Sequence, residues 1–140
     1  MDILVAVDGS AYTKRMLAYL AAHDEWLGAS HCYIVVHAVP ALPLRVVRAL
    51  ERAQVDAYYA SGSDAVFKPI RAFAKQQGLQ ASYVSKVGAP ADVLARLARA
   101  RKFGLLMLGS HGHGALASLV LGSVAVKVLA TCKLPVLLIR

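Results

Sequence analysis

Short apolar runs alternate along the chain with longer stretches in which apolar residues recur every three or four positions. Most of the runs are continuous and rich in branched side chains, which is typical of parallel strands buried on both faces. The stretches between them have the spacing of amphipathic helices. The pattern predicts strands at 3–7, 33–37, 82–87, 105–108 and 136–139.

Helix signals fill the intervals between these runs. Ser10 is expected to cap a first helix, which the apolar spacing extends to a stop at Gly28. The interval from Pro43 to Gly78 is predicted as two helices, because Ser61-Gly62-Ser63 is expected to break the helical spacing. The remaining two helices are expected to follow Pro90 and Gly122.

This alternation predicts an α/β fold, with one domain over residues 1–140. We expect a Rossmann-like three-layer sandwich around a five-stranded parallel sheet in the order 3-2-1-4-5. In that order the first and fourth strands are neighbours whose connections leave in opposite directions, which opens a crevice at their carboxyl ends. The Asp8-Gly9-Ser10 turn and the loop that begins at Gly109 are expected to meet there.

Composition narrows the class of protein. Apolar residues make up 58% of the chain and charged residues 17%, which excludes a disordered protein. The uncharged stretch between His113 and Lys127 is too short for a membrane-spanning helix, and no basic segment precedes the first apolar run. We therefore expect a cytoplasmic protein without a membrane segment. Cys32 and Cys132 lack metal or redox spacing and are expected to be buried free thiols.

The formal net charge is +8, from 16 Lys and Arg against 8 Asp and Glu, which suits a polyanionic partner. The basic residues do not indicate nucleic acid, however. Arg45, Arg48 and Arg52 lie at helical spacing without interleaved aromatic residues, as on a solvated helix face. The cations at 96–102 lie near a helix end, where they complement the helix dipole.

A glycine and serine motif follows the fourth predicted strand. It consists of Gly109-Ser110-His111-Gly112, nine further residues and Gly122-Ser123. Glycines let backbone N–H groups approach a phosphate closely, and a helix that starts at Gly122 offers unpaired N–H groups to an anion. The alternative is an ordinary glycine-bearing loop in which Ser123 caps the helix. No Walker A sequence and no G-x-G-x-x-G fingerprint occur at the first helix, which excludes those two nucleotide-binding classes.

Taken together, these motifs resemble those of the universal stress protein family, in particular its ATP-binding type. The resemblance covers essentially the whole chain, through segments 3–10, 36–39, 88–91, 108–112, 122–124 and 135–139. It implies that a nucleotide lies in the crevice between the first and fourth strands. The nucleotide-binding residues implied are Val7, Asp8, Gly9, Ala38, Leu108, Gly109, His111, Gly112, Gly122, Ser123 and Val124.

The resemblance also implies a role for each part of this set. Asp8 is expected to contact the adenosine, and Ala38 to line the adenine, with Leu108 and Gly109 beside the base and ribose. The phosphates are expected at Gly112 and at 122–124. Three positions depart from the family pattern without removing the motif: Ala38 replaces the usual Val, Ala125 a frequent Thr or Ser, and Gly104 a frequent Asp.

Several polar residues have two interpretations. Asp8 either contacts a ribose or accepts N–H groups of its own turn, and the crevice favours the ribose. His111 and His113 have the spacing of two metal ligands but no evident third, so metal binding by this pair is not expected. His37 lies in a buried strand and is expected to be a hydrogen-bonded core histidine.

The leading hypothesis is a nucleotide-responsive stress or signalling module that binds ATP, with or without Mg²⁺, and whose occupancy orders the 109–122 loop. The alternative from the enzyme class is an adenine-nucleotide hydrolase or nucleotidyl-transferring enzyme on a related fold. No general base or cationic clamp stands in the motifs, so at most slow ATP hydrolysis is expected. A third hypothesis is a nucleotide-free interaction module that uses the basic faces.

The ligand and the assembly remain open in part. The residues do not distinguish ATP from a cyclic or dinucleotide adenylate, and they do not identify a protein partner. The last strand, 136–139, is apolar and expected at a sheet edge, where an open strand invites pairing. We therefore predict a homodimer through this strand, to which the family resemblance also points.

Overall fold

A computed structural model describes residues 1–114 and 120–140 and confirms the α/β fold. Its parallel sheet has five strands in the order β3-β2-β1-β4-β5, as predicted. The middle of the glycine-bearing segment, residues 115–119, lies outside the described residues. The strands are β1 (Asp2–Ala6), β2 (Cys32–Val39), β3 (Gln80–Val87), β4 (Leu105–Gly109) and β5 (Val136–Ile139). The helices are α1 (Ala11–Ala22), α2 (Asp24–Leu27), α3 (Leu44–Ala49), α4 (Arg52–Gln76), α5 (Pro90–Ala100) and α6 (Ser123–Thr131).

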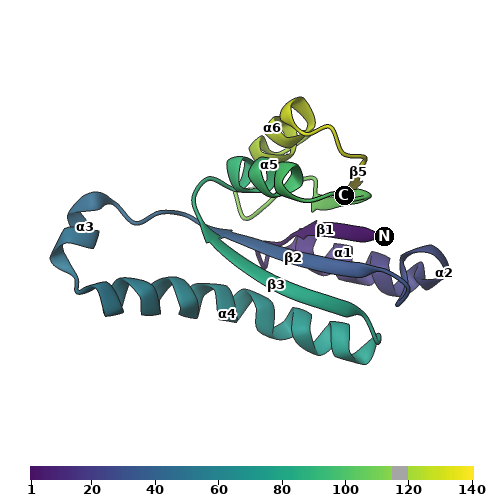
Figure 1. Cartoon of the computed structure of the whole chain (residues 1–140), viewed down its shortest axis with the longest axis horizontal. Coiled ribbons are helices and arrows are strands. Elements are labelled where there is room, and N and C mark those ends of the chain that lie inside the picture. Colours follow the sequence, from purple (N-terminus) through teal and green to yellow (C-terminus); the bar gives the residue numbers. More distant parts are fainter. Residues whose placement is uncertain (115–119) are drawn as a thin grey trace.

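Helices cover both faces of the sheet (Figure 1), with α1, α2 and α4 on one side and α5 and α6 on the other. Alternate residues of β1 therefore enter different cores. Ile3 and Val5 pack with Met16 of α1, whereas Leu4 packs with Leu94 of α5. Because both faces are covered, the central strands β1 and β4 are apolar almost without interruption, whereas the edge strand β3 is partly exposed and carries polar residues.

Helix α4 corrects the predicted break at Ser61-Gly62-Ser63, because it runs through this tripeptide without interruption. Phe67 and Ile70 pack against the sheet from the same helix, and this burial outweighs the low helix propensity of glycine. Ser63 is buried and its hydroxyl bonds that of Ser85 on β3, so a small polar residue is suited to this position. The break lies earlier, at Leu50, and Glu51 starts α4 with a capping box.

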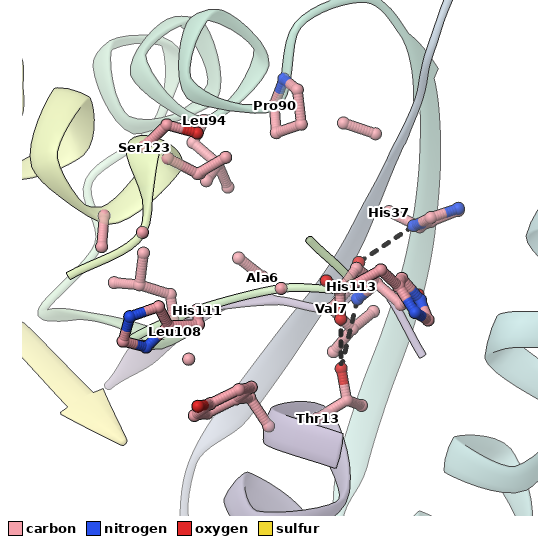
Figure 2. Close-up of a pocket in the computed structure, with 18 of the residues that line it drawn as sticks. Ala6, Val7, Thr13, His37, Pro90, Leu94, Leu108, His111, His113 and Ser123 are labelled. Atoms are coloured by element: carbon pink, nitrogen blue, oxygen red, sulfur yellow. Dashed lines mark hydrogen bonds between the residues drawn. The ribbon is translucent and has the colours of Figure 1, made fainter. Parts of the chain in front are cut away.

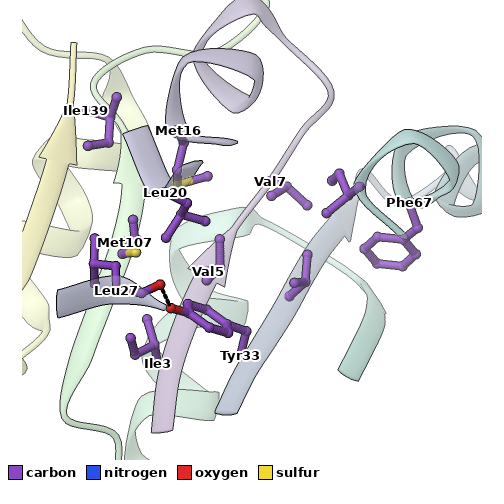
Figure 3. Packing of buried hydrophobic residues seen from close by; sticks show 12 residues of the cluster. Ile3, Val5, Val7, Met16, Leu20, Leu27, Tyr33, Phe67, Met107 and Ile139 are labelled. Carbon is purple, nitrogen blue, oxygen red and sulfur yellow. Dashed lines mark hydrogen bonds between the residues drawn. The ribbon is translucent and has the colours of Figure 1, made fainter. Parts of the chain in front are cut away.

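The first helix also ends before its predicted stop. Helix α1 ends at Ala22, and the short α2 reaches from there to Gly28. The backbone of His23 leaves the helical region while its ring Nδ1–H donates to the Tyr19 carbonyl at 2.8 Å. This change of direction lets Leu27 enter the core, where the Tyr33 hydroxyl donates to its carbonyl (Figure 3). Burial raises the pKa of Tyr33 to about 12.

The prediction that both cysteines are free thiols is confirmed, whereas the prediction that both are buried is wrong. Cys32 and Cys132 are both free, but Cys32 is exposed and Cys132 is half-buried. Cys32 is the first residue of β2, and its thiol lies 3.8 Å from the side-chain oxygen of Gln80, the first residue of β3. Within the described part of the chain, no helix combines the length and apolar character needed to cross a membrane.

The continuity of α4 predicts the effect of a substitution at Gly62. A Cβ atom there meets nothing within 4 Å and the backbone is helical, so Gly62→Ala should stabilise the protein by about 0.5 to 1 kcal/mol, measured by urea unfolding. Gly78→Ala is the matched control. Gly78 is equally open but has φ +66°, so alanine there should destabilise. A loss of stability in Gly62→Ala would contradict a continuous helix.

Candidate functional site

A cavity of about 450 Å³ opens at the carboxyl ends of β1 and β4, at the predicted crevice (Figure 2). Its walls come from the turn after β1, the end of β2, the start of α5, the loop after β4 and the start of α6. The position follows from topology, because the chain leaves β1 toward one face of the sheet and β4 toward the other. The volume lies within the usual range of small-molecule sites.

The structure brings the predicted binding residues together at this cavity, with one exception. Gly9 does not line it and instead forms the turn below, where its φ of +77° is a conformation that favours glycine. Its N–H donates to the Thr13 hydroxyl at 3.2 Å. The predicted residues that line the cavity are Val7, Asp8, Ala38, Leu108, Gly109, His111, Gly112, Gly122, Ser123 and Val124.

The two carboxylate oxygens of Asp8 have different surroundings. The interpretation that Asp8 accepts hydrogen bonds from its own turn is confirmed for one of them, whereas the contact with a ribose stays a prediction. Oδ1 accepts the Ser10 N–H at 2.9 Å and the Thr13 hydroxyl at 3.1 Å, so it fastens the turn. Oδ2 lies toward the glycine loop, since a Cβ atom on Gly112 would stand 2.6 Å from it. Thr13 also accepts the N–H of Asp8 at 3.2 Å, which closes the network. The turn therefore holds Asp8 in place and leaves Oδ2 on the loop side.

At two glycines of the loop, neighbouring atoms leave too little room for a side chain. A Cβ atom on Gly109 would lie 2.6 Å from the Cβ of Tyr12 in α1. On Gly122 it would lie 3.1 Å from both the Ser110 carbonyl oxygen and the His111 Cα. These contacts press the two ends of the loop against α1 and against each other.

One predicted phosphate donor is engaged elsewhere. The Gly122 N–H donates to the Ser110 carbonyl at 2.7 Å, so it ties the start of α6 to the loop instead of facing a ligand. This corrects the prediction that Gly122 itself donates to a phosphate. The N–H groups of Ser123, Val124 and Ala125 form the first turn of α6 and have no partner within that helix. They remain as donors at the cavity wall.

Three histidines line the cavity. His37 Nδ1–H donates to the Val7 carbonyl at 2.9 Å, which confirms the predicted hydrogen bond but places a half-buried ring at the cavity wall instead of deep in the core. His113 Nε2–H donates to the next carbonyl, that of Asp8, at 2.7 Å. His111 packs its ring against Tyr12, with centroids 5.3 Å apart, and its Nδ1 lies 3.1 Å from the Ser110 hydroxyl.

Few of the described residues that line the cavity carry a formal charge. Among the described lining residues there is no Lys or Arg, and Asp8 is the one carboxylate. The described residues also contain no cluster of three or more His, Cys, Asp or Glu that could hold a metal ion. A bound anion would therefore rely on backbone N–H groups, hydroxyls and histidines.

Sequence reasoning missed part of the wall. Pro90 and Ser110 lie within the quoted motifs and Pro40 directly follows one, so the motifs could have indicated them. Tyr12 and Leu94 enter from helix faces whose rotation the sequence does not fix. The lining residues not predicted are Ala6, Tyr12, Thr13, Val36, His37, Pro40, Pro90, Leu94, Ser110, His113, Gly114 and Ala125.

Comparison with known proteins assigns the family. The profile described as the Universal stress protein family matches residues 1–140. The chain belongs to this family. The resemblance that the motifs indicated is thereby confirmed, whereas the ATP-binding type within the family is a separate question.

Individual members of the family support the same assignment. A Thermus aquaticus protein described as "Universal stress protein in QAH/OAS sulfhydrylase 3'region" is 33% identical over 147 residues, covering 99% of this chain and 97% of its own. Universal stress protein UspA from Lactobacillus plantarum has the same fold, with a TM-score of 0.81 at 19% identity, over 100% of this chain and 97% of its own. A universal stress protein solved in complex with cAMP has a TM-score of 0.65 at 25% identity, over 100% of this chain and 96% of its own.

Proposed function

We propose that this universal stress protein binds ATP in the cavity between β1 and β4 and acts as a nucleotide-responsive module. The observation that carries the proposal is the pairing of two features across one cavity. The first turn of α6 offers N–H groups and the Ser123 hydroxyl, while Asp8 Oδ2 faces the loop from the turn after β1. The complex of a family member with cAMP supports an adenine nucleotide as the ligand class.

The wall suggests how the nucleotide lies. Ala38, Pro40 and Pro90 form an apolar part suited to an adenine ring, and Leu108 adds to it. We assign the ribose hydroxyls to Asp8, and the phosphates to Gly112 and the start of α6, all of which line the cavity. Mg²⁺, if it accompanies ATP, would take most of its ligands from phosphate oxygens and water, with Asp8 as the nearest carboxylate.

ATP binding should be weakened by Gly122→Val. Because the added side chain meets the backbone of residues 110 and 111, it should displace the loop and the first turn of α6. We expect ATP affinity to fall by about tenfold, the effect of losing a hydrogen bond to a charged group, with a smaller change for adenosine. Titration calorimetry measures both ligands, and Gly62→Ala is the control. Equal ATP affinity in wild type and Gly122→Val would remove the phosphate assignment.

We further propose that ATP is a regulatory ligand that is hydrolysed slowly at most. The cavity supplies backbone donors, one carboxylate held by its own turn and no Lys or Arg among its described lining residues. Efficient nucleotide hydrolases use a positioned base and a cationic finger, the latter worth about a thousandfold or more.

Single-turnover hydrolysis of labelled ATP tests this assignment, with and without magnesium. Wild type, Asp8→Ala and Ser123→Ala should all remain far below ordinary enzyme rates, which are on the order of 10 per second. Magnesium should change the rate only modestly. Turnover at an ordinary rate that disappears in either variant would instead establish the hydrolase alternative.

We also propose a homodimer through β5. This strand lies at the edge of the sheet, and Val136, Leu137 and Leu138 are only half-buried. An apolar edge strand is an open template for pairing, which a second copy can satisfy about a two-fold axis. Val126 and Leu129 on the preceding helix α6 are exposed as well, which adds apolar surface on the same segment of the chain.

Light scattering at micromolar concentration should give the mass of a dimer. Leu138→Lys should shift the protein toward monomer or aggregate, because it places a charge on the pairing edge. Leu44→Lys is the matched control, since Leu44 is an exposed leucine on α3, which follows β2 and not β5. A monomer mass for wild type would contradict the proposal.

A further inference from the structure

The cavity lacks fixed positive charge where the proposed ligand is a polyanion. None of its described lining residues is Lys or Arg, and Asp8 adds a negative charge. His37, His111 and His113 are the described lining side chains that become cationic by taking up a proton. Phosphates in the cavity would favour the charged form of such a ring, because an opposite charge nearby stabilises it. The three rings differ in how well each can accept this proton.

The hydrogen bond of His113 fixes its tautomer. A carbonyl oxygen only accepts, so the bond to the Asp8 carbonyl at 2.7 Å places a hydrogen on Nε2. In the neutral ring Nδ1 then carries the lone pair. Protonation at Nδ1 adds a charge and a second donor without breaking the existing bond. His113 can therefore change charge while it stays attached to the turn after β1.

The other two rings are less suited to this change. His37 is half-buried on β2, and its ring meets Phe67 of α4 edge-on with centroids 6.2 Å apart, so a charge there would be placed beside an apolar ring. His111 packs on Tyr12 of α1 and lies against the Ser110 hydroxyl. His113 is exposed between two glycines, and its charge would remain hydrated.

The cavity wall holds few other titratable groups besides His113. Among the described lining residues these are Asp8 in the turn after β1, Tyr12 on α1, His111 in the loop and His37 on β2, and His113 bonds the Asp8 carbonyl. Asp8 favours a charged ring, whereas a second charged histidine would oppose it. The N-terminal turn of α6 lines the same cavity and contributes no carboxylate to the described wall.

We propose that His113 takes up a proton from solvent when a nucleoside polyphosphate occupies the cavity, and thereby sets the preference for polyphosphates over unphosphorylated adenosine. This inference rests on the proposed nucleotide-binding function and assigns the residue that senses the phosphates. No covalent bond changes, and the proton adds to Nδ1 while Nε2–H keeps the Asp8 carbonyl. Binding of ATP should therefore strengthen as the pH falls, and binding of adenosine should not.

Titration calorimetry of ATP and of adenosine, in buffers of different ionisation enthalpy, counts the protons taken up on binding. The informative variant is His113→Gln, because its amide can donate to the Asp8 carbonyl but does not titrate. His31→Gln is the matched control, since His31 Nε2–H donates to the Trp26 carbonyl at 2.9 Å in the turn before β2. ATP titrates in the same pH range, and this contribution cancels between wild type and variant.

We expect wild type and His31→Gln to take up more protons with ATP than His113→Gln does, with no such difference for adenosine. From about pH 8 to about pH 6, the ratio of ATP to adenosine affinity should rise about two- to fivefold more in wild type than in His113→Gln. Equal proton uptake in wild type and His113→Gln, with ATP bound by both, would overturn the inference and leave the proposed function standing. Failure of wild type to bind either ligand would instead remove the proposed function, and the inference with it.

Discussion

The parallel pairing of β1 with β4 determines where this protein can hold a ligand. Leu4 pairs with Leu106 at the centre of the sheet, and the chain leaves the two strands toward opposite faces. The connections that follow the two strands therefore diverge, and a cavity opens between them at the carboxyl ends. The pairing is stabilised by complete burial, since Leu4 and Leu106 are both 0% exposed and pack beneath α5 and α6. The same strand pairing therefore belongs to the buried core and determines the position of the cavity.

The turn after β1 is the second requirement, because it converts the cavity into a site with fixed chemistry. Thr13 receives two backbone N–H groups and donates to Asp8, so a buried hydroxyl on α1 orients a carboxylate at the end of β1. The loop after β4 contacts this turn through Gly112 and His113, and it is tied to α6 by Gly122. Side chains that are held before a ligand arrives lose little conformational freedom on binding, which favours affinity.

The parts of this structure that depend on periodicity could be predicted from the sequence, and the parts that depend on packing could not. The apolar patterns of the strands and the positions of the glycines predicted the strand order and part of the cavity wall. The continuity of α4 through Ser61-Gly62-Ser63 depends on Phe67 and Ile70 reaching the sheet, a tertiary contact that outweighs local propensity. The Gly122 N–H was misassigned because its acceptor, the Ser110 carbonyl, is brought near only by the folded loop. The exposure of Cys32 likewise depends on its place as the first residue of β2, a boundary that the apolar pattern put one residue later.

The chemistry of the wall explains why binding without rapid turnover is the proposal that fits this cavity best. Its described polar groups are backbone N–H groups, hydroxyls, three histidines and one carboxylate. The carboxylate, His37 and His113 already hydrogen-bond to other groups of the protein, so we propose that they position a ligand and do not activate water. A helix N-terminus stabilises phosphate charge in the ground state as well as in a transition state, so it contributes to affinity more than to rate. If His113 takes up a proton as proposed, a histidine at the loop, in place of a fixed cation, makes the strength of that binding depend on protonation. Such a cavity would then report which adenine compound occupies it, because the charge of the ligand would change the charge of the loop that contacts it.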